Sequence, residues 1–200
     1  VTETYQHQDK KFSIKLYEQC FSQTNPFICD SMLSWVISNI QSFENDLMEL
    51  HCGLGTFTIP LSRYFNKVLA TENSRPSIQA LHENVKLNNI ENVYTGRLSG
   101  KETLEAFKGV RIFRRLKDIN LEQFEIDSIF LDPPREGLDS FTLENIIGIK
   151  NIIYISCNFD SFKRDIQALK TTHDILKLAM FDQFPYTEHI ESGAILRKKY

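Results

Sequence analysis

Reactive polar residues stand directly beside the apolar segments of this sequence. Cys157 follows the isoleucine-rich segment 151–156, Asp132 follows another apolar segment, and Glu191 precedes the apolar segment 192–197. A cysteine at a ligand-binding edge can be activated as a thiolate, and a nearby carboxylate can accept a proton. The pattern therefore predicts nucleophilic chemistry with an acid–base partner, although a lone cysteine is more often an inert core residue.

Two further residues compete for these roles. Cys52 is expected in the same crevice and is an alternative nucleophile, while His189 is an alternative base. Cys20 and Cys29 are expected in the core or on the surface. The four cysteines contain no C-x-x-C pair, so neither a zinc site nor an iron–sulfur site is expected, and a reducing cytoplasmic setting fits best.

A glycine-bearing turn predicts an adenosine-binding site. Gly53 and Gly55 follow a short apolar strand, which lets a ligand approach the backbone closely. Glu72 follows about 20 residues later, where an acidic residue accepts hydrogen bonds from a ribose. The third glycine of a dinucleotide fingerprint would fall at Thr58 and is absent. This pattern alone does not separate S-adenosylmethionine from NAD, and a tight turn with a surface carboxylate remains the alternative.

Two loops could position a planar substrate. The segment 132–135, Asp-Pro-Pro-Arg, predicts a rigid extended turn in which Arg135 either orients a base or faces solvent. The segment 181–193 is rich in aromatic residues, and Phe184 and Tyr186 are candidates for stacking on a base. Periodicity by itself favours a packed hairpin loop there.

The order of apolar segments predicts an α/β fold. Strands are expected at 47–51, 67–71, 93–95, 127–131, 151–156, 175–181 and 192–197, with helices at 26–40, 57–64, 74–87, 140–147 and 161–169. Alternating strands and helices indicate a mostly parallel seven-stranded sheet covered on both faces. The last connection is too short for a crossover, so the final two strands should form an antiparallel hairpin. This architecture is typical of class I, Rossmann-like methyltransferases.

Size and charge set the domain organisation. The 200 residues fit one domain, and residues 25–200 are expected to be its catalytic part. Residues 1–24, whose first fifteen are consistent with one edge strand, are expected to link it to a preceding domain. No apolar run reaches the roughly 20 residues of a membrane helix. The net charge of −3 gives no global attraction to nucleic acid, and the basic clusters at 108–117 and 197–199 are either solvated faces or RNA contacts.

Five motifs together resemble the RNA 5-methyluridine methyltransferases. The similarity runs from about residue 21 to the C-terminus and is carried by Phe21-Ser22-Gln23-Thr24-Asn25, Glu49-Leu50-His51-Cys52-Gly53-Leu54-Gly55-Thr56-Phe57, Asp132-Pro133-Pro134-Arg135-Glu136-Gly137-Leu138, Ser156-Cys157-Asn158 and the segment 181–193. The Phe-Asp-Gln-Phe-Pro-Tyr-Thr stretch is similar to the tRNA-specific branch, which modifies a T-loop uridine.

The resemblance implies S-adenosylmethionine as cofactor and assigns the site residues. Cys157 would be the nucleophile and Glu191 the base, and Arg135, Phe184 and Tyr186 are candidates for substrate contacts. The cofactor contacts would be Gln23, His51, Gly53, Thr56, Glu72 and Asp132. The family usually has Tyr at His51, Asn at Thr56 and Pro at Phe159. The family also carries an N-terminal RNA-binding portion, so the resemblance implies that residues 1–24 link the catalytic domain to an RNA-binding domain. A monomer that acts on the tRNA T arm, without metal or membrane attachment, is expected.

Three alternatives stay open at this point. A methyltransferase that acts on an exocyclic amine could use the Asp-Pro-Pro turn but would leave Cys157 without a role. An RNA-binding module with vestigial catalysis would bind tRNA regardless of Cys157. A nicotinamide-dependent enzyme is disfavoured by the missing third glycine.

Overall fold

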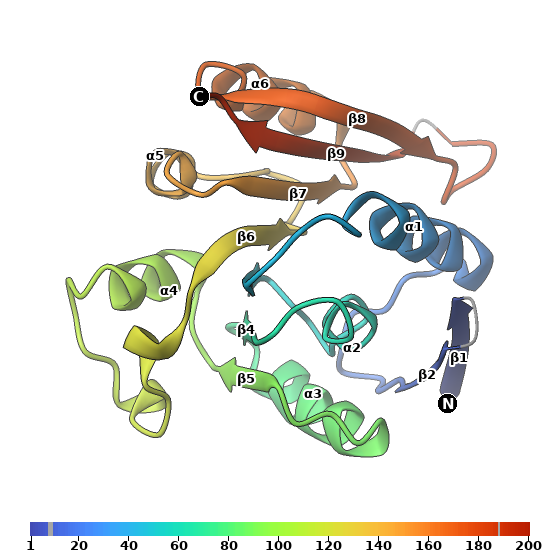
Figure 1. Ribbon diagram of the computed structural model, residues 1–200. Helices are drawn as coiled ribbons and strands as arrows, with labels where there is room; N and C mark the ends of the chain where they lie inside the picture. The colour runs from blue at the N-terminus through green and yellow to red at the C-terminus, as the bar shows by residue number, and fades with distance from the viewer. Residues whose placement is uncertain (8–9, 188) are drawn as a thin grey trace.

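A seven-stranded mixed sheet organises the chain, with strand order β5-β4-β3-β6-β7-β9-β8 (Figure 1). The computed structural model describes residues 1–7, 10–187 and 189–200. The strands are β3 (Asp46–Leu50), β4 (Val68–Thr71), β5 (Val93–Gly96), β6 (Ile126–Leu131), β7 (Asn151–Ser156), β8 (His173–Phe181) and β9 (Glu191–Lys198). Strand β9 is antiparallel to both β7 and β8, whereas β3 to β7 pair in parallel. The predicted fold class is confirmed.

The central strands are apolar along their whole length because both faces of the sheet are covered. Every residue of β3, β4 and β7 is buried. Successive side chains point to opposite faces, so Leu47 belongs to one core cluster and Met48 to the other. Helices α1 to α3 contribute to the first cluster and α4 to α6 to the second. Burial on two faces is what favours the continuous apolar runs.

All the described α-helices except α2 begin at residues whose side chains cap the free amide groups of the first turn. Asn25, Ser74, Ser99, Asp139 and Asn158 each accept hydrogen bonds from such amides. The helices are α1 (Pro26–Asn39), α2 (Thr58–Leu61), α3 (Arg75–Leu87), α4 (Gly100–Phe107), α5 (Ser140–Ile146) and α6 (Phe159–Leu169). Two short 3-10 helices, Arg114–Leu116 and Leu121–Gln123, follow α4.

The N-terminal segment differs from the single edge strand that its pattern predicts. It forms an antiparallel hairpin of β1 (Thr2–His7) and β2 (Lys10–Lys15), separate from the main sheet. The hairpin packs on α3, where Asn88 accepts from the Ser13 amide at 2.9 Å and Asn84 from the Lys15 amide at 2.8 Å. Because α3 side chains satisfy this strand edge, the segment does not need to join the sheet. The boundary at residue 24 stays a prediction.

Two helices also differ from their expected bounds. The predicted helix at 57–64 is reduced to the four residues of α2, and α6 begins at Phe159 because Asn158 caps it. Among the described residues, no helix has the length and hydropathy needed to cross a membrane.

Candidate active site

Cys157 and Glu191 meet where two strands end. Strands β7 and β9 are antiparallel, and their last pair at this edge joins Ser156 to Ser192. Cys157 follows Ser156 and Glu191 precedes Ser192, so both residues flank the end of the same ladder. Cys157 is half-buried, and Glu191 is buried with 3% of its surface exposed. Chain reversal at β9 therefore brings together two residues that the sequence separates.

Burial raises the pKa values of both Glu191 and Cys157. Burial raises the pKa of Glu191 to about 7, and the Arg135 guanidinium opposes that rise. Burial also raises the pKa of the Cys157 thiol; the negative charges of Glu191 and Asp132 raise it further, while Arg135 lowers it. For Asp132, burial and then the charge of Glu191 raise the pKa to about 8. Arg135 is therefore the cation that favours ionisation of both Cys157 and Glu191.

A cavity of about 230 Å³ opens beside Cys157. Arg135, Phe159, His189 and Ile190 are among its walls, together with Asn158 and Asp160 at the start of α6. Phe159 stands where the related family usually has Pro, and its side chain is 44% exposed. The cavity thus combines a thiol, a guanidinium and apolar walls.

A buried carboxylate holds the Asp-Pro-Pro-Arg loop. Asp165 Oδ2 accepts the Leu138 amide at 2.8 Å and the Tyr154 hydroxyl at 2.7 Å. Arg164 pairs with Asp165 and donates to the carbonyl oxygens of Glu136 and Leu138. The loop that carries Asp132 and Arg135 is therefore fixed to α6 at its far end.

A second cavity lies at the end of β3. Its walls include Phe21, Gln23, Glu49, His51, Cys52, Gly53, Thr56 and Asp132. Gly53 and Gly55 have positive φ angles of 55° and 97°, and a Cβ on Gly55 would lie 2.5 Å from Leu81 Cδ1. Asp132 lines this cavity, and its negative charge raises the pKa of the Cys157 thiol in the first cavity.

Cys52 and Cys157 lie in different surroundings. Cys52 is buried in the wall of the second cavity, and burial raises the pKa of its thiol well above the ordinary value. Cys157 is half-buried beside a guanidinium in the first cavity. The geometry favours Cys157 over Cys52 as a thiolate.

The predicted cofactor residues gather around the second cavity. Gln23, His51, Gly53, Thr56 and Asp132 line it. Glu72 stands at its border, where its carboxylate accepts the Gly53 amide at 3.3 Å and the Ser74 amide at 2.7 Å. Burial lowers the pKa of His51, so a neutral imidazole is favoured there.

Sequence reasoning missed Glu49 and Gln183. Glu49 is fully buried, burial raises its pKa to about 8, and its Oε2 has no hydrogen-bond partner among the described residues. The buried Gln183 donates from its amide nitrogen to Gln23 Oε1. Both residues lie within the family motifs, Glu49 at the start of one and Gln183 in the segment 181–193, but Gln183 lies 160 residues from its partner, so the sequence does not assign a contact to it.

The predicted stacking residues are not brought into the first cavity. Phe184 packs edge-on against the His189 ring, with 6.1 Å between ring centroids, and His189 lines the cavity. Tyr186 is fully exposed and has a positive φ of 68°. Glu188, which precedes His189 in the sequence, is outside the described residues. Within the described part of the chain, no group of three His, Cys, Asp or Glu residues could hold a metal ion.

Comparison with known proteins decides the family. The sequence profile of the tRNA (Uracil-5-)-methyltransferases matches residues 1–199. The chain belongs to this family. A tRNA/tmRNA (uracil-C(5))-methyltransferase from Nitratiruptor sp. is 48% identical over 99% of the chain, and one from Sulfurovum sp. is 48% identical over 100%. The chain spans about half the length of these family members, 55% and 54%.

A solved structure of similar fold supports the architecture. The Pyrococcus abyssi tRNA (uracil-54, C5)-methyltransferase, solved with S-adenosyl-L-homocysteine, has a TM-score of 0.73 and 24% identity. The match covers 98% of this chain and 44% of that protein. The similarity establishes the class I methyltransferase fold for this family member.

Proposed function

We propose that this protein transfers a methyl group from S-adenosylmethionine to carbon 5 of a uridine in tRNA, the T-loop uridine 54. The observation that carries the proposal is the meeting of Cys157 and Glu191 at the end of the β7–β9 ladder. A thiol and a carboxylate at one site are what substitution at carbon 5 of uracil requires. The names of the family members from Nitratiruptor and Sulfurovum support the same reaction on tRNA and add tmRNA as a second substrate.

The second cavity fits the cofactor chemically. Glu72 is held by two backbone amides at the end of β4, which suits a ribose diol. Glu49 and Asp132 are carboxyl groups with raised pKa values, and Glu49 Oε2 lacks a partner among the described residues. A cationic ligand would stabilise both in their ionised form. S-adenosylmethionine is such a ligand and supplies an electrophilic methyl group on a positively charged sulfur, with Gln23, His51, Gly53 and Thr56 as further contacts.

Cys157 starts the reaction at carbon 6. Its thiolate forms a carbon–sulfur bond there, and the electrons of the C5–C6 double bond move onto the uracil carbonyl as an enolate. Carbon 5 thereby becomes nucleophilic and forms a bond to the methyl group of S-adenosylmethionine; the methyl–sulfur bond breaks, and its electron pair stays on the sulfur of the leaving S-adenosylhomocysteine. Arg135 favours the thiolate at the start of this sequence because its positive charge lowers the pKa of Cys157.

Glu191 completes the reaction. Its carboxylate removes the proton from carbon 5, the electron pair of that bond restores the C5–C6 double bond, and the carbon–sulfur bond breaks. Cys157 leaves as thiolate and is ready for another cycle. A pKa of about 7 places Glu191 near balance between its two protonation states at neutral pH, which suits a proton acceptor.

The target uridine has to leave its stack to reach Cys157. Turning a base out of an RNA loop costs a few kcal/mol, and stacking on aromatic side chains offsets part of this free energy. Phe184 and Tyr186 lie on the loop between β8 and β9; Phe184 packs against His189 of the cavity wall, and Tyr186 is fully exposed to solvent. We assign Arg135 to orient the uracil and these two aromatic residues to stack on the bases around it.

Methyl transfer measured on the full-length protein tests this function. Unmodified T-arm RNA and radiolabelled S-adenosylmethionine should give 5-methyluridine at the target position, identified by nuclease digestion and mass spectrometry. RNA in which only that uridine is replaced by cytidine is the control and should take up no label. Label at an exocyclic amine, or equal labelling of the control RNA, would contradict the proposal.

A further inference from the structure

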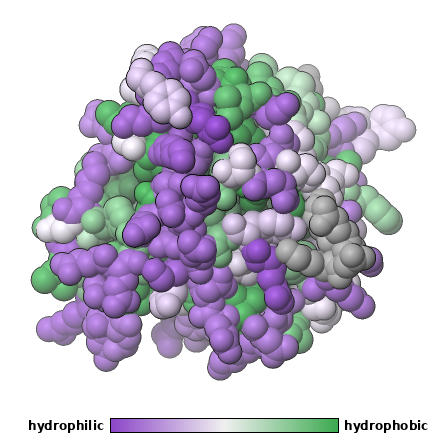
Figure 2. Space-filling view, in the orientation of Figure 1, coloured by the Kyte–Doolittle hydropathy of each residue, from purple (hydrophilic) through white to green (hydrophobic). Residues whose placement is uncertain are grey.

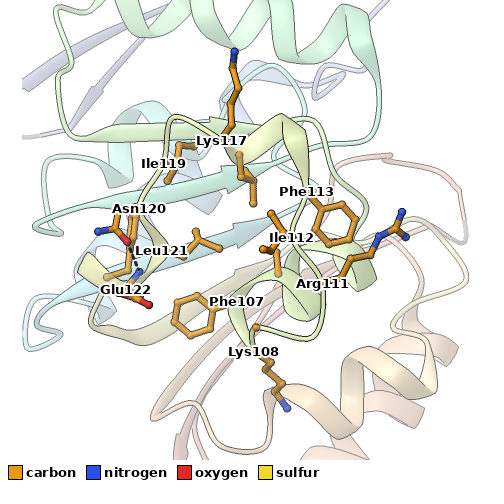
Figure 3. Close-up of a pocket in the computed structure, with 14 residues that line it drawn as sticks. Phe107, Lys108, Arg111, Ile112, Phe113, Lys117, Ile119, Asn120, Leu121 and Glu122 are labelled. Atoms are coloured by element: carbon orange, nitrogen blue, oxygen red, sulfur yellow. Dashed lines mark hydrogen bonds between the residues drawn. The ribbon is translucent and has the colours of Figure 1, made fainter.

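A second surface on the molecule has the features of a binding site. A cavity of about 680 Å³ lies between α4 and the segment that leads to β6 (Figure 3). Its lining includes the apolar side chains of Phe107, Ile112 and Phe113. The side chains of Lys108 and Lys117 extend in opposite directions from this lining, as Figure 3 shows. None of the motifs for the proposed methyl transfer includes this surface, which we call the α4 cavity.

The α4 cavity lies away from the catalytic edge of the sheet. Helix α4 starts near His51, where a Cβ on Gly100 would lie 3.4 Å from the imidazole Nε2. The chain then reaches the opposite edge, because Lys67, just before β4, donates to the Gln123 carbonyl at 2.6 Å. The six-residue strand β6 separates the two edges by about 20 Å. A ligand in the α4 cavity is therefore distinct from the target uridine at Cys157.

The segment that forms the cavity is fixed in place. Phe113 and Leu116 are buried, and a Cβ on Gly96 would lie 2.6 Å from Leu116 Cδ2. Arg115 donates to the Arg97 carbonyl and pairs with Glu102 at 3.2 Å. These anchors hold a segment whose other side chains remain at the surface. The walls of the cavity are therefore held in place by the packing of the fold.

The same segment leaves an apolar side chain in solvent. Ile112 is 96% exposed and Val110 is 70% exposed. Ile112 lies among the cavity walls, beside Phe113 and Arg111. An exposed apolar residue inside a cavity gains free energy when a ligand covers it.

Charge identifies the ligand class. Residues 108–117 hold five Lys and Arg side chains and no Asp or Glu, in a chain of net charge −3. Figure 2 shows hydrophilic residues dominating the lower left of the molecule, over α4 and the segment after it. In Figure 3, Arg111 lies opposite Glu122 and Asn120, so the positive side of the cavity is the side of Lys108 and Arg111. A polyanion with apolar parts fits this surface.

We propose that the α4 cavity binds the sugar–phosphate backbone of the tRNA substrate at a place distant from the target uridine. Lys108, Arg111 and Lys117 contact phosphates, and Ile112 contacts a ribose or a base. Phosphate contacts fix the register of a nucleic acid without reading its sequence. The α4 cavity would therefore contribute affinity for the tRNA at a place distant from Cys157, without taking part in the chemical step. This inference rests on the proposed function, because that function makes tRNA the polyanion.

Binding of intact tRNA to the full-length protein tests the proposal. The variant Lys108→Ala/Arg111→Ala/Lys117→Ala should bind tRNA about tenfold more weakly or worse, measured by fluorescence anisotropy over a series of salt concentrations. The slope of log binding constant against log salt should decrease by about 2 to 3, because three phosphate contacts are lost. The control Lys86→Ala/Lys170→Ala/Lys177→Ala removes three exposed lysines elsewhere and should leave the slope close to that of the unmodified protein.

A second variant checks the apolar lining. Ile112→Asp replaces a side chain that is 96% exposed, so the fold should be retained and tRNA binding should weaken. In both cavity variants the rate of methyl transfer at saturating tRNA should be unchanged, since the catalytic edge is untouched. Equal affinity and equal salt slope for the cavity and control variants would overturn the proposal. A protein that binds tRNA through this cavity but never methylates it would refute the proposed function while keeping this inference.

Discussion

In the proposed mechanism Cys157 and Glu191 each lose a proton before they act, and burial opposes that loss at both residues. The opposing influence is Arg135, whose charge favours both ionised forms. The thiol and the carboxyl group also repel each other when both are charged. At this scale the site is a balance between burial, which favours the protonated forms of both groups, and one cation, which favours their ionised forms.

The first prediction concerns pH. The rate of methyl transfer at saturating substrates should rise from about pH 6 to about pH 8, because a base with a pKa of about 7 acts in its deprotonated form. The raised pKa of Cys157 should extend the rise to higher pH. A series of single-turnover rates across this interval checks the direction, and a rate that falls with pH would contradict the assigned roles.

Removing the cation should shift this profile. In Arg135→Gln the pKa values of Cys157 and Glu191 should both increase, so the rising limb moves to higher pH. Arg135→Lys keeps the charge and should restore most of the profile. If Arg135→Gln lowers the rate by the same factor at every pH, Arg135 acts on substrate position and has no effect on ionisation.

Replacing the base should separate the two halves of the reaction. Glu191→Gln keeps the size of the side chain but cannot take the proton from carbon 5. Methylated RNA should then remain covalently attached to Cys157 and appear as a shifted band on a denaturing gel. Full turnover with no retained adduct would exclude Glu191 as the base and would make His189 the next candidate.

Loops between the strands and helices carry the site residues, and two buried side chains, Asp165 and Gln183, form hydrogen bonds that hold these loops. Asp165 on α6 holds the end of the Asp-Pro-Pro-Arg loop through Leu138 and Tyr154. Gln183, just after β8, is hydrogen-bonded to Gln23 in the wall of the cofactor cavity. The hydrogen bond between Gln183 and Gln23 therefore connects the loop after β8 to the wall of the second cavity.

Loss of the loop anchor should destabilise the protein. Asp165→Ala leaves the Tyr154 hydroxyl and the Leu138 amide unsatisfied, at about 1–3 kcal/mol each. Chemical denaturation should show a lower free energy of unfolding than for the control Asp174→Ala, which removes an exposed carboxylate. Equal stability of the two variants would show that solvent replaces the Asp165 contacts.

The glutamine contact should affect cofactor binding. Gln183→Leu leaves the Gln23 side chain without its donor, so Gln23 should no longer be held in the cavity wall. Isothermal titration calorimetry should show weaker binding of S-adenosylmethionine, by about fivefold or more for the loss of about 1 kcal/mol. The exposed Gln79→Leu is the matched control, and unchanged affinity in Gln183→Leu would refute the coupling.

At the scale of the whole molecule, the sequence pattern predicts the features of the fold that depend on the order and spacing of the apolar segments. The alternating apolar segments correctly predict seven strands in a mostly parallel sheet, and the short last connection correctly predicts that β8 and β9 are antiparallel. The gathering of Cys157, Glu191 and Asp132 at one edge follows from those strand ends. The N-terminal hairpin, the Asp165 anchor and the Gln183–Gln23 contact could not be predicted in this way. The packing of the hairpin on α3 and both side-chain contacts depend on specific partner side chains, which leave no periodic signal in the sequence.

Covalent trapping tests the central claim most directly. T-arm RNA with 5-fluorouridine at the target position is incubated with the full-length protein and S-adenosylmethionine, and the products are separated on a denaturing gel. Fluorine cannot leave carbon 5 as a proton does, so the account predicts a stable protein–RNA adduct. The adduct should form with Cys52→Ala and be absent with Cys157→Ala. An adduct that persists in Cys157→Ala, or methyl transfer to unmodified RNA by that variant at an ordinary rate, would contradict the account.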